Sequence, residues 1–148
     1  MDVYNPEPGV ILFDSQLNPT ELADFGKDLA IVGCRHFSEA SAVSARKSGV
    51  HMYPMRLLIE DLSSACDGLM ELALQWPSVQ VIINARVLDP AFVKTEYPSH
   101  GGLQTRELFY FIERLKLLRN YQGGRVECPE GELKEQIERA LGKQQKPF

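Results

Sequence analysis

Three apolar segments of this sequence are followed directly by side chains that could take part in chemistry. These side chains are Asp14, Cys34, Arg35, His36, Asn84 and Arg86. If the segments are parallel strands, their carboxyl ends meet at one edge of the sheet, where ligands bind in open α/β folds. An acid, a thiol, an imidazole and two guanidinium groups could then form a site for a nucleotide or another anion. Polar, turn-forming residues also end strands where no site exists, and we favour that second interpretation.

The cysteines and histidines are the residues that could act as nucleophiles or as metal ligands. Cys34 lies two residues from His36, so the imidazole could activate a thiolate. A cysteine at the end of a buried strand is more often a small core residue. The three cysteines of the chain are widely spaced, and His51 and His100 stand alone. We therefore expect neither a disulfide framework nor a metal site, and no cofactor.

A glycine pair, Gly101-Gly102, precedes the strongest helical segment of the sequence. Its backbone N–H groups could hold an anion with help from His100 and Arg106. Two glycines at the end of a long loop can equally provide a sharp turn into the helix, and we favour the turn.

Apolar runs and helical patterns alternate along the chain. Strands are predicted at 9–15, 29–34, 50–53, 79–85 and 123–128. Helices are predicted from Asn18 onward and at 38–49, 55–76, 103–121 and 129–142. Such alternation predicts an α/β fold with three layers, in which a mostly parallel five-stranded sheet has helices on both faces. We expect one domain over residues 1–148, with a flavodoxin- or receiver-like topology.

The order of these elements resembles the receiver domains of bacterial response regulators. Asp14 and Cys128-Pro129 fall roughly where receivers carry an acidic pair and a Lys-Pro, but no acid ends the segment VHMYP and Cys128 replaces the lysine. The resemblance therefore implies a degenerate receiver that is not phosphorylated. A second segment, LAIVGCRHFSE, resembles the opening of nucleotide-binding folds of the DprA type, although the glycine-rich second half of that pattern is missing.

The helix predicted at 103–121 is apolar on two sides. One side, with Leu108, Phe111, Ile112, Leu115 and Leu118, has the spacing of a core face. A second apolar stripe lies opposite, with Leu103, Tyr110, Leu117 and Tyr121, and the charged Glu113 and Arg114 border it. An apolar centre with a charged rim is typical of a protein interface. The alternative is that the loop 86–102 folds back and covers the stripe.

Charge and length exclude several classes of function. A net charge of −4 argues against nucleic acid as the main partner. The longest apolar run is too short to cross a bilayer and no signal peptide is evident, so we expect a cytoplasmic protein. The two-sided helix leads us to expect a non-catalytic interaction or assembly module, which contacts itself as a homodimer or docks a protein partner. The alternative is a small nucleotide- or anion-binding enzyme with its site at the strand ends, and the balance favours a protein that is not an enzyme.

Overall fold

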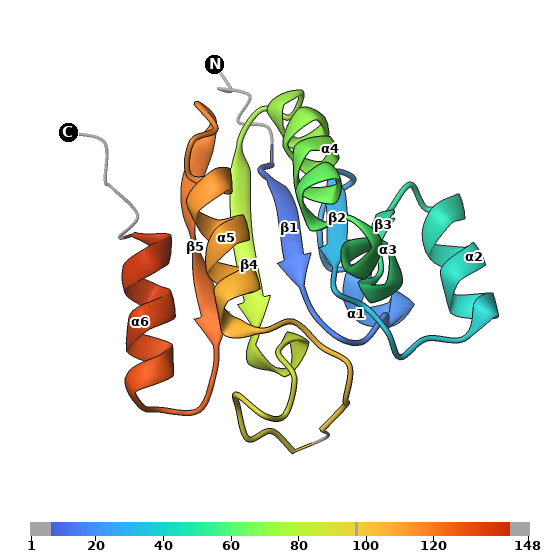
Figure 1. Ribbon diagram of the computed structural model, residues 1–148. Helices are drawn as coiled ribbons and strands as arrows, with labels where there is room; N and C mark the ends of the chain where they lie inside the picture. The colour runs from blue at the N-terminus through green and yellow to red at the C-terminus, as the bar shows by residue number, and fades with distance from the viewer. Residues whose placement is uncertain (1–6, 97, 143–148) are drawn as a thin grey trace.

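The computed structural model describes residues 7–96 and 98–142 and contains a five-stranded sheet (Figure 1). Its strands are β1 Gly9–Phe13, β2 Leu29–Val32, β3 His51–Tyr53, β4 Val79–Asn84 and β5 Tyr121–Glu127. All four strand pairings are parallel. β1 and β2 are buried at every residue, as expected for parallel strands that are covered on both faces. The prediction of an α/β fold with a five-stranded parallel sheet is confirmed.

The order of the strands is β3-β2-β1-β4-β5, which differs from the predicted topology. A flavodoxin- or receiver-like sheet places β1 between β2 and β3. Here β1 lies between β2 and β4, and β3 is an edge strand beside β2. The receiver-like topology is therefore wrong, because local sequence patterns identify strands but do not determine which strands are neighbours. The chain changes direction across the sheet between β1 and β4.

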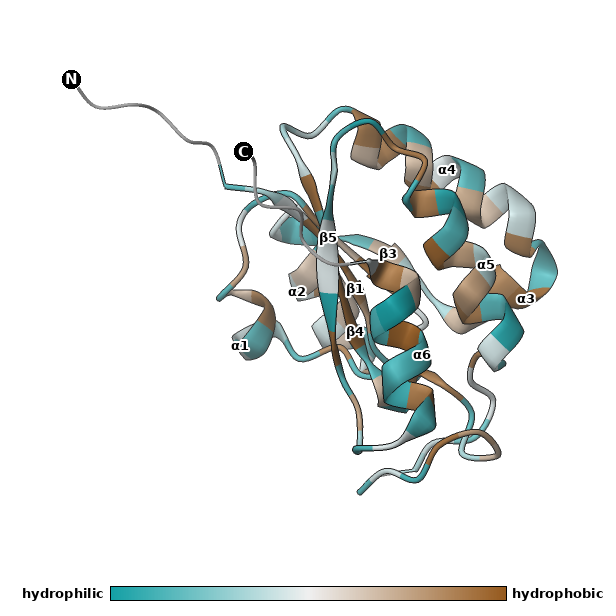
Figure 2. Ribbon diagram, turned by 90° about the vertical axis from the view of Figure 1, so that its left-hand side faces the viewer, coloured by the Kyte–Doolittle hydropathy of each residue, from teal (hydrophilic) through white to brown (hydrophobic). Residues whose placement is uncertain are grey.

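The helices form two unequal layers (Figure 2). The short helices α1 Pro19–Leu22 and α2 Glu39–Lys47 pack on one face, with Leu12, Ile31 and Ile82 of the sheet beneath them. The other face is covered by α3 Met55–Glu60, α4 Leu62–Leu74, α5 Thr105–Leu115 and α6 Glu132–Leu141. Among the described residues, no helix has the length and apolar character needed to cross a membrane.

The single long helix predicted at 55–76 is two helices, α3 and α4, separated at Asp61. Asp61 has an extended backbone, and its carboxylate accepts a hydrogen bond from the backbone N–H of Ser64 at 3.0 Å. This contact caps the first turn of α4, which otherwise has unpaired N–H groups. Asp61, which falls inside the apolar pattern of the predicted helix, is therefore the N-cap of a second helix.

Helix α5 is shorter than predicted and ends at Leu115. The Glu107 side chain accepts a hydrogen bond from the backbone N–H of Gln104 at 2.8 Å and fixes the start of the helix. Leu108, Phe111 and Ile112 are buried, and the Phe111 ring meets Phe13 of β1 edge-on at 5.5 Å. The predicted core face is therefore confirmed.

The second apolar stripe does not form one continuous surface. Leu103 is fully buried in a bridge with Leu88, which belongs to the predicted covering loop. Tyr121 is not helical but opens β5, and its hydroxyl donates to the backbone carbonyl of Leu141. Tyr110 is half-buried against Phe111. The helix prediction was too long, so it assigned residues from three structural environments to one stripe.

The charged border of that stripe makes contacts within the chain. Arg114 pairs with Asp67 of α4 and lies over the Tyr110 ring at 5.7 Å. Glu113 pairs with Lys116 at 3.6 Å. Leu117 lies beyond the end of α5 and is 76% exposed.

Leu115 and Leu117 provide a test of this assignment. Leu115→Ala should reduce the free energy of unfolding by about 2–5 kcal/mol, because it leaves a cavity under α5. Leu117→Ala should change it by less than about 0.5 kcal/mol, since the side chain faces water. Urea unfolding followed by circular dichroism measures both, and equal losses would contradict the burial described here.

Candidate functional site

A crevice of about 520 Å³ lies over the carboxyl-terminal parts of β1, β4 and β5, on one face of the sheet. The strands contribute alternate residues, which therefore point to the same face of the sheet. These residues are Leu12, Asp14, Ile82, Asn84, Arg125 and Glu127. Arg86 follows β4, while Glu21, Asp24 and Phe25 come from α1 and the turn after it. We call this set the switch-point crevice.

The position of the crevice follows from the strand order. In open α/β sheets, ligands bind where neighbouring strands are followed by connections that leave in opposite directions. Here that point lies between β1 and β4, and Asp14 and Arg86 follow these two strands. Strand β5 adds no residue to the core on this face, so its exposed Arg125 and Glu127 border the opening.

Asp14 and Arg86 form a two-pronged ion pair inside the crevice. Arg86 Nε donates to Asp14 Oδ1 at 2.6 Å, and Nη2 donates to Oδ2 at 2.9 Å. The side chains are 8% and 21% exposed respectively, so the pair is largely removed from water. This fork geometry is the strongest that a guanidinium and a carboxylate make.

The charge around Arg86 is predominantly negative. Hydrogen bonding to Asp14 is the main cause that raises the pKa of Arg86 above its usual value, and the charges of Asp14, Glu21 and Glu127 raise it further, whereas burial opposes the shift. The crevice as a whole holds four carboxylates and two guanidinium groups. It therefore carries an excess of negative charge, whereas the alternative interpretation of the sequence had placed a nucleotide or another anion at the strand ends.

Asn84 positions Arg86 rather than a ligand. Its side-chain oxygen accepts a hydrogen bond from the backbone N–H of Arg86 at 3.1 Å. This contact caps the single 3₁₀ turn Ala85–Val87, which directs the chain out of β4. Three of the six predicted site residues, Asp14, Asn84 and Arg86, are thus brought together.

Arg35 has a structural role, because its guanidinium is already bound by the chain. It donates to Ser99 Oγ at 2.9 Å and to a series of backbone carbonyls. These carbonyls belong to Gly33, Arg86, Val87, Leu88 and Ser99, at 2.8–3.5 Å. Burial is the main cause that lowers the pKa of Arg35. These hydrogen bonds connect the end of β2 to the segment between β4 and α5.

The glycine pair after that connection is likewise occupied by the chain. Asp89 accepts hydrogen bonds from the backbone N–H of Gly101 at 2.9 Å and of Gly102 at 3.4 Å. A Cβ at Gly102 would lie 2.7 Å from the Val87 carbonyl oxygen, so the close approach requires glycine. Gly101 has a φ of +84°, which glycine tolerates best. The turn interpretation is confirmed, and the anion cradle is filled by Asp89.

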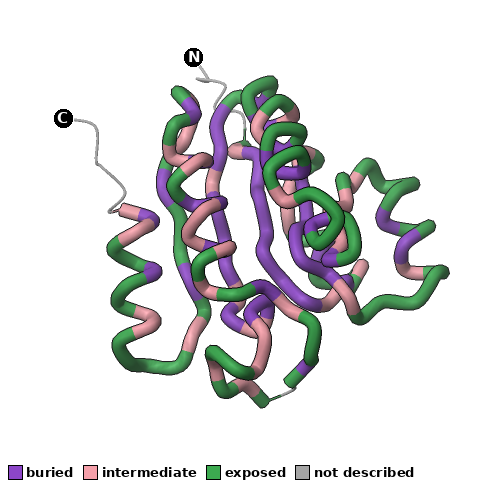
Figure 3. Tube along the Cα trace, viewed as in Figure 1, coloured by how far each residue is buried: buried purple, intermediate pink, exposed green. Residues whose placement is uncertain are grey.

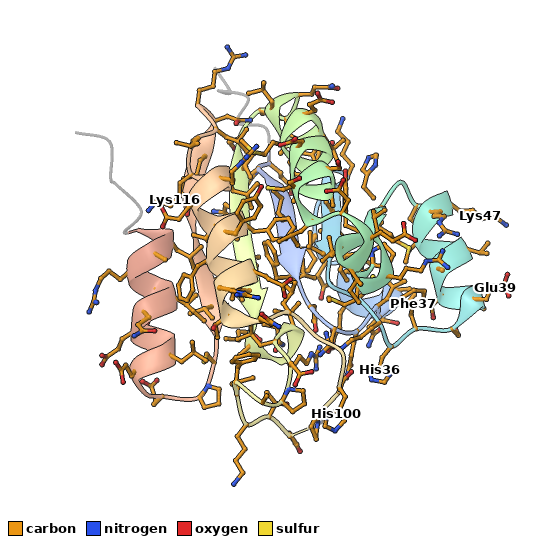
Figure 4. The ribbon with its side chains drawn as sticks, in the orientation of Figure 1. His36, Phe37, Glu39, Lys47, His100 and Lys116 are labelled. Carbon is orange, nitrogen blue, oxygen red and sulfur yellow. The ribbon has the colours of Figure 1, made fainter. Side chains whose placement is uncertain are left out.

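Cys34 and His36 do not form a reactive pair. Cys34 is fully buried in the core beneath α1 and α2, and burial raises the pKa of its thiol to about 12. His36 is exposed, and Figure 4 shows it and His100 at the carboxyl-end edge of the molecule. A protonated thiol in the core is not a nucleophile.

Four crevice residues were missed from the sequence, namely Glu21, Asp24, Arg125 and Glu127. Glu127 pairs in register with Asn84, and Arg125 with Ile82. Their alternate spacing in the last strand was visible, but it becomes informative only once β5 is known to lie beside β4. Figure 3 shows the exposed segments of β5 beside the buried strands.

Arg35→Lys tests the structural role of Arg35. An ammonium group cannot reproduce the planar array of donors, so we expect a loss of roughly 2–4 kcal/mol in the free energy of unfolding. Hydrogen exchange should accelerate over residues 85–104. Arg46→Lys, at an exposed position on α2, is the matched control. Unchanged exchange in the Arg35 variant would contradict this role.

Thiol labelling tests the burial of the cysteines. At about pH 8, Cys128 should react with iodoacetamide in the folded protein, whereas Cys34 and Cys66 should not, because both are buried. The Cys34 thiol has a higher pKa in the folded chain than its ordinary value of 9.0. Its contribution to the free energy of unfolding is therefore fully present below pH 9.0 and is lost as the pH rises towards 12. Mass spectrometry locates the label, and urea-unfolded protein should be labelled at all three positions.

Comparison with known proteins places this geometry in context. No protein-family model matches the sequence. Over 98 residues the chain is 33% identical to a formimidoylglutamase of Halobacterium salinarum, a match that covers 64% of this chain and 32% of that protein. The arginase of Bacillus subtilis is similar in structure, with a TM-score of 0.75, 18% identity, and coverage of 93% of this chain and 63% of the arginase. The formimidoylglutamase of Bacillus subtilis gives a TM-score of 0.73 at 21% identity, and covers 90% of this chain and 50% of that one.

The chain spans about a third of the length of the curated relative and between half and two thirds of the two solved structures. Its fold is arginase-like, not receiver-like. The expectation of a non-catalytic interaction module is overturned, because the similar proteins are ureohydrolase enzymes. The alternative, an enzyme with its site at the strand ends, agrees better with these similarities.

Proposed function

We propose that this chain has a ureohydrolase-type function, in which the switch-point crevice binds the cationic guanidino or amidino group of a small substrate. The reaction class is hydrolysis of a C–N bond at that group, by analogy with the arginase and formimidoylglutamases that the chain resembles. Because the chain spans only part of these relatives, the reaction is proposed for the whole protein.

The observation that carries the proposal is the excess of carboxylates in the crevice around a bound guanidinium. Guanidines and amidines are protonated near neutral pH and present a planar array of N–H donors. Glu21, Asp24 and Glu127 supply acceptors at the opening, whereas Asp14 in the interior is bound by Arg86. Carboxylates bind such planar cations through paired hydrogen bonds. A phosphate or nucleotide would meet repulsion from the same groups.

Enzymes of this family depend on manganese, so the fit of the described residues to such an ion matters. A divalent ion requires several convergent carboxylate, imidazole or water ligands. Residues 7–96 and 98–142 contain no group of three or more His, Cys, Asp or Glu side chains that could hold one. Both oxygens of Asp14 are bound by Arg86. The described residues therefore do not fit a manganese centre, and what they supply is recognition of an organic cation.

Ligand binding provides the test. Agmatine, L-arginine or N-formimidoyl-L-glutamate should raise the melting temperature of the wild-type protein by mass action. L-Citrulline, whose side chain ends in a neutral urea group, should not. Calorimetry gives the affinity, and assays for urea and formamide, with and without added Mn²⁺, detect hydrolysis.

Glu127→Gln should weaken binding about tenfold, the effect of losing roughly 1.4 kcal/mol of charge attraction at the opening. Glu39→Gln, on the distant helix α2, is the matched control (Figure 4). No thermal response to any of these three ligands, together with no product, would reject the proposal.

A further inference from the structure

We propose that Asp14 is a guanidinium-binding carboxylate that the chain fills with its own Arg86, so that Arg86 competes with the substrate from within. This inference rests on the proposed function, because it identifies which acid would receive the cationic group. It also assigns a role to Arg86, which keeps the substrate from Asp14 by binding that carboxylate itself.

The geometry of the pair is the basis of the inference. A free guanidinium ligand binds a carboxylate through two parallel N–H donors, and Arg86 uses Nε and Nη2 in this way. Both Asp14 oxygens are taken, so a second guanidinium cannot bind in the same manner while Arg86 is in place. The crevice therefore already contains the type of group that it is suited to bind.

The surroundings of Arg86 resemble those of a bound ligand. The charges of Glu21 and Glu127 act on the guanidinium in addition to that of Asp14, and these three acids come from α1, β5 and the end of β1. Carboxylates from three separate elements thus line the crevice that holds Arg86, and Asp14 is the one bound to it. An ion pair that only joined the ends of β1 and β4 would not require the other two acids.

The backbone of Arg86 is fixed, whereas its side chain borders the opening. Asn84 holds the backbone N–H of Arg86, and Arg35 Nη2 donates to its backbone carbonyl at 3.0 Å. The side chain retains 21% exposure. Displacement of Arg86 from Asp14 therefore requires side-chain rotation alone, with the 3₁₀ turn left intact.

Removal of Arg86 should create a guanidinium site that can be filled from solution. Arg86→Ala leaves the Asp14 carboxylate largely buried and unpaired, so we expect the melting temperature to fall by roughly 5 °C or more. About 50 mM guanidinium chloride or agmatine should recover at least roughly 2 °C of this loss in the variant, and less in the wild type. Sodium chloride at the same concentration corrects for ionic strength, and urea is the neutral ligand of the same shape.

Two further variants make the result specific. The double variant Asp14→Asn, Arg86→Ala should show no recovery, because the receiving charge is gone. Arg46→Ala, which removes an exposed guanidinium on α2 outside the crevice, should respond like the wild type. If Arg86→Ala does not fold, Arg86→Gln retains a donor group and should bind agmatine about tenfold more tightly than the wild type in calorimetry.

Recovery confined to the Arg86 variants with an intact Asp14 supports the inference. Equal recovery by urea, equal recovery in the wild type, or none in a folded Arg86 variant would overturn it and leave the pair a structural contact. The proposed function is judged separately, by substrate binding and product formation in the wild type.

Discussion

The parallel arrangement of the five strands is the constraint on which the other features depend. Because every strand runs in the same direction, all the carboxyl ends emerge at one edge of the sheet. The order β3-β2-β1-β4-β5 then separates the outgoing connections of β1 and β4, and a crevice opens between them. Asp14 and Arg86 meet at that point although 72 residues separate them in the chain.

Two arginines at this edge have opposite roles, which arise from their different neighbours. Arg35 is surrounded by backbone carbonyls, so its hydrogen bonds stabilise a connection between elements. Arg86 is surrounded by carboxylates, so it forms a two-pronged ion pair with Asp14 in the switch-point crevice. Residue type alone did not distinguish them, and both had been assigned to the same candidate ligand set.

Local patterns predicted most of the elements but little of the site. The apolar run at 79–85 and the cap at Asn18 are decided by nearby residues, and both appear in the structure. The strand order, the break at Asp61 and the end of α5 at Leu115 depend on tertiary contacts and hydrogen bonds that periodicity does not encode. Glu127 joins the crevice only through its register with Asn84, so no pattern in the last strand could reveal its role.

The connection from β4 to α5 has a consequence for how this protein can vary. The bridge between Leu88 and Leu103, with Asp89 bound to Gly101, brings the two ends of the segment together, and Arg35 bound to Ser99 adds a contact near its end. For a loop whose ends are held together, doubling the number of residues costs only about 0.6 kcal/mol of additional loop-closure free energy. Homologous chains can therefore lengthen or shorten the stretch from Pro90 to Pro98 while the sheet edge beneath it keeps its shape.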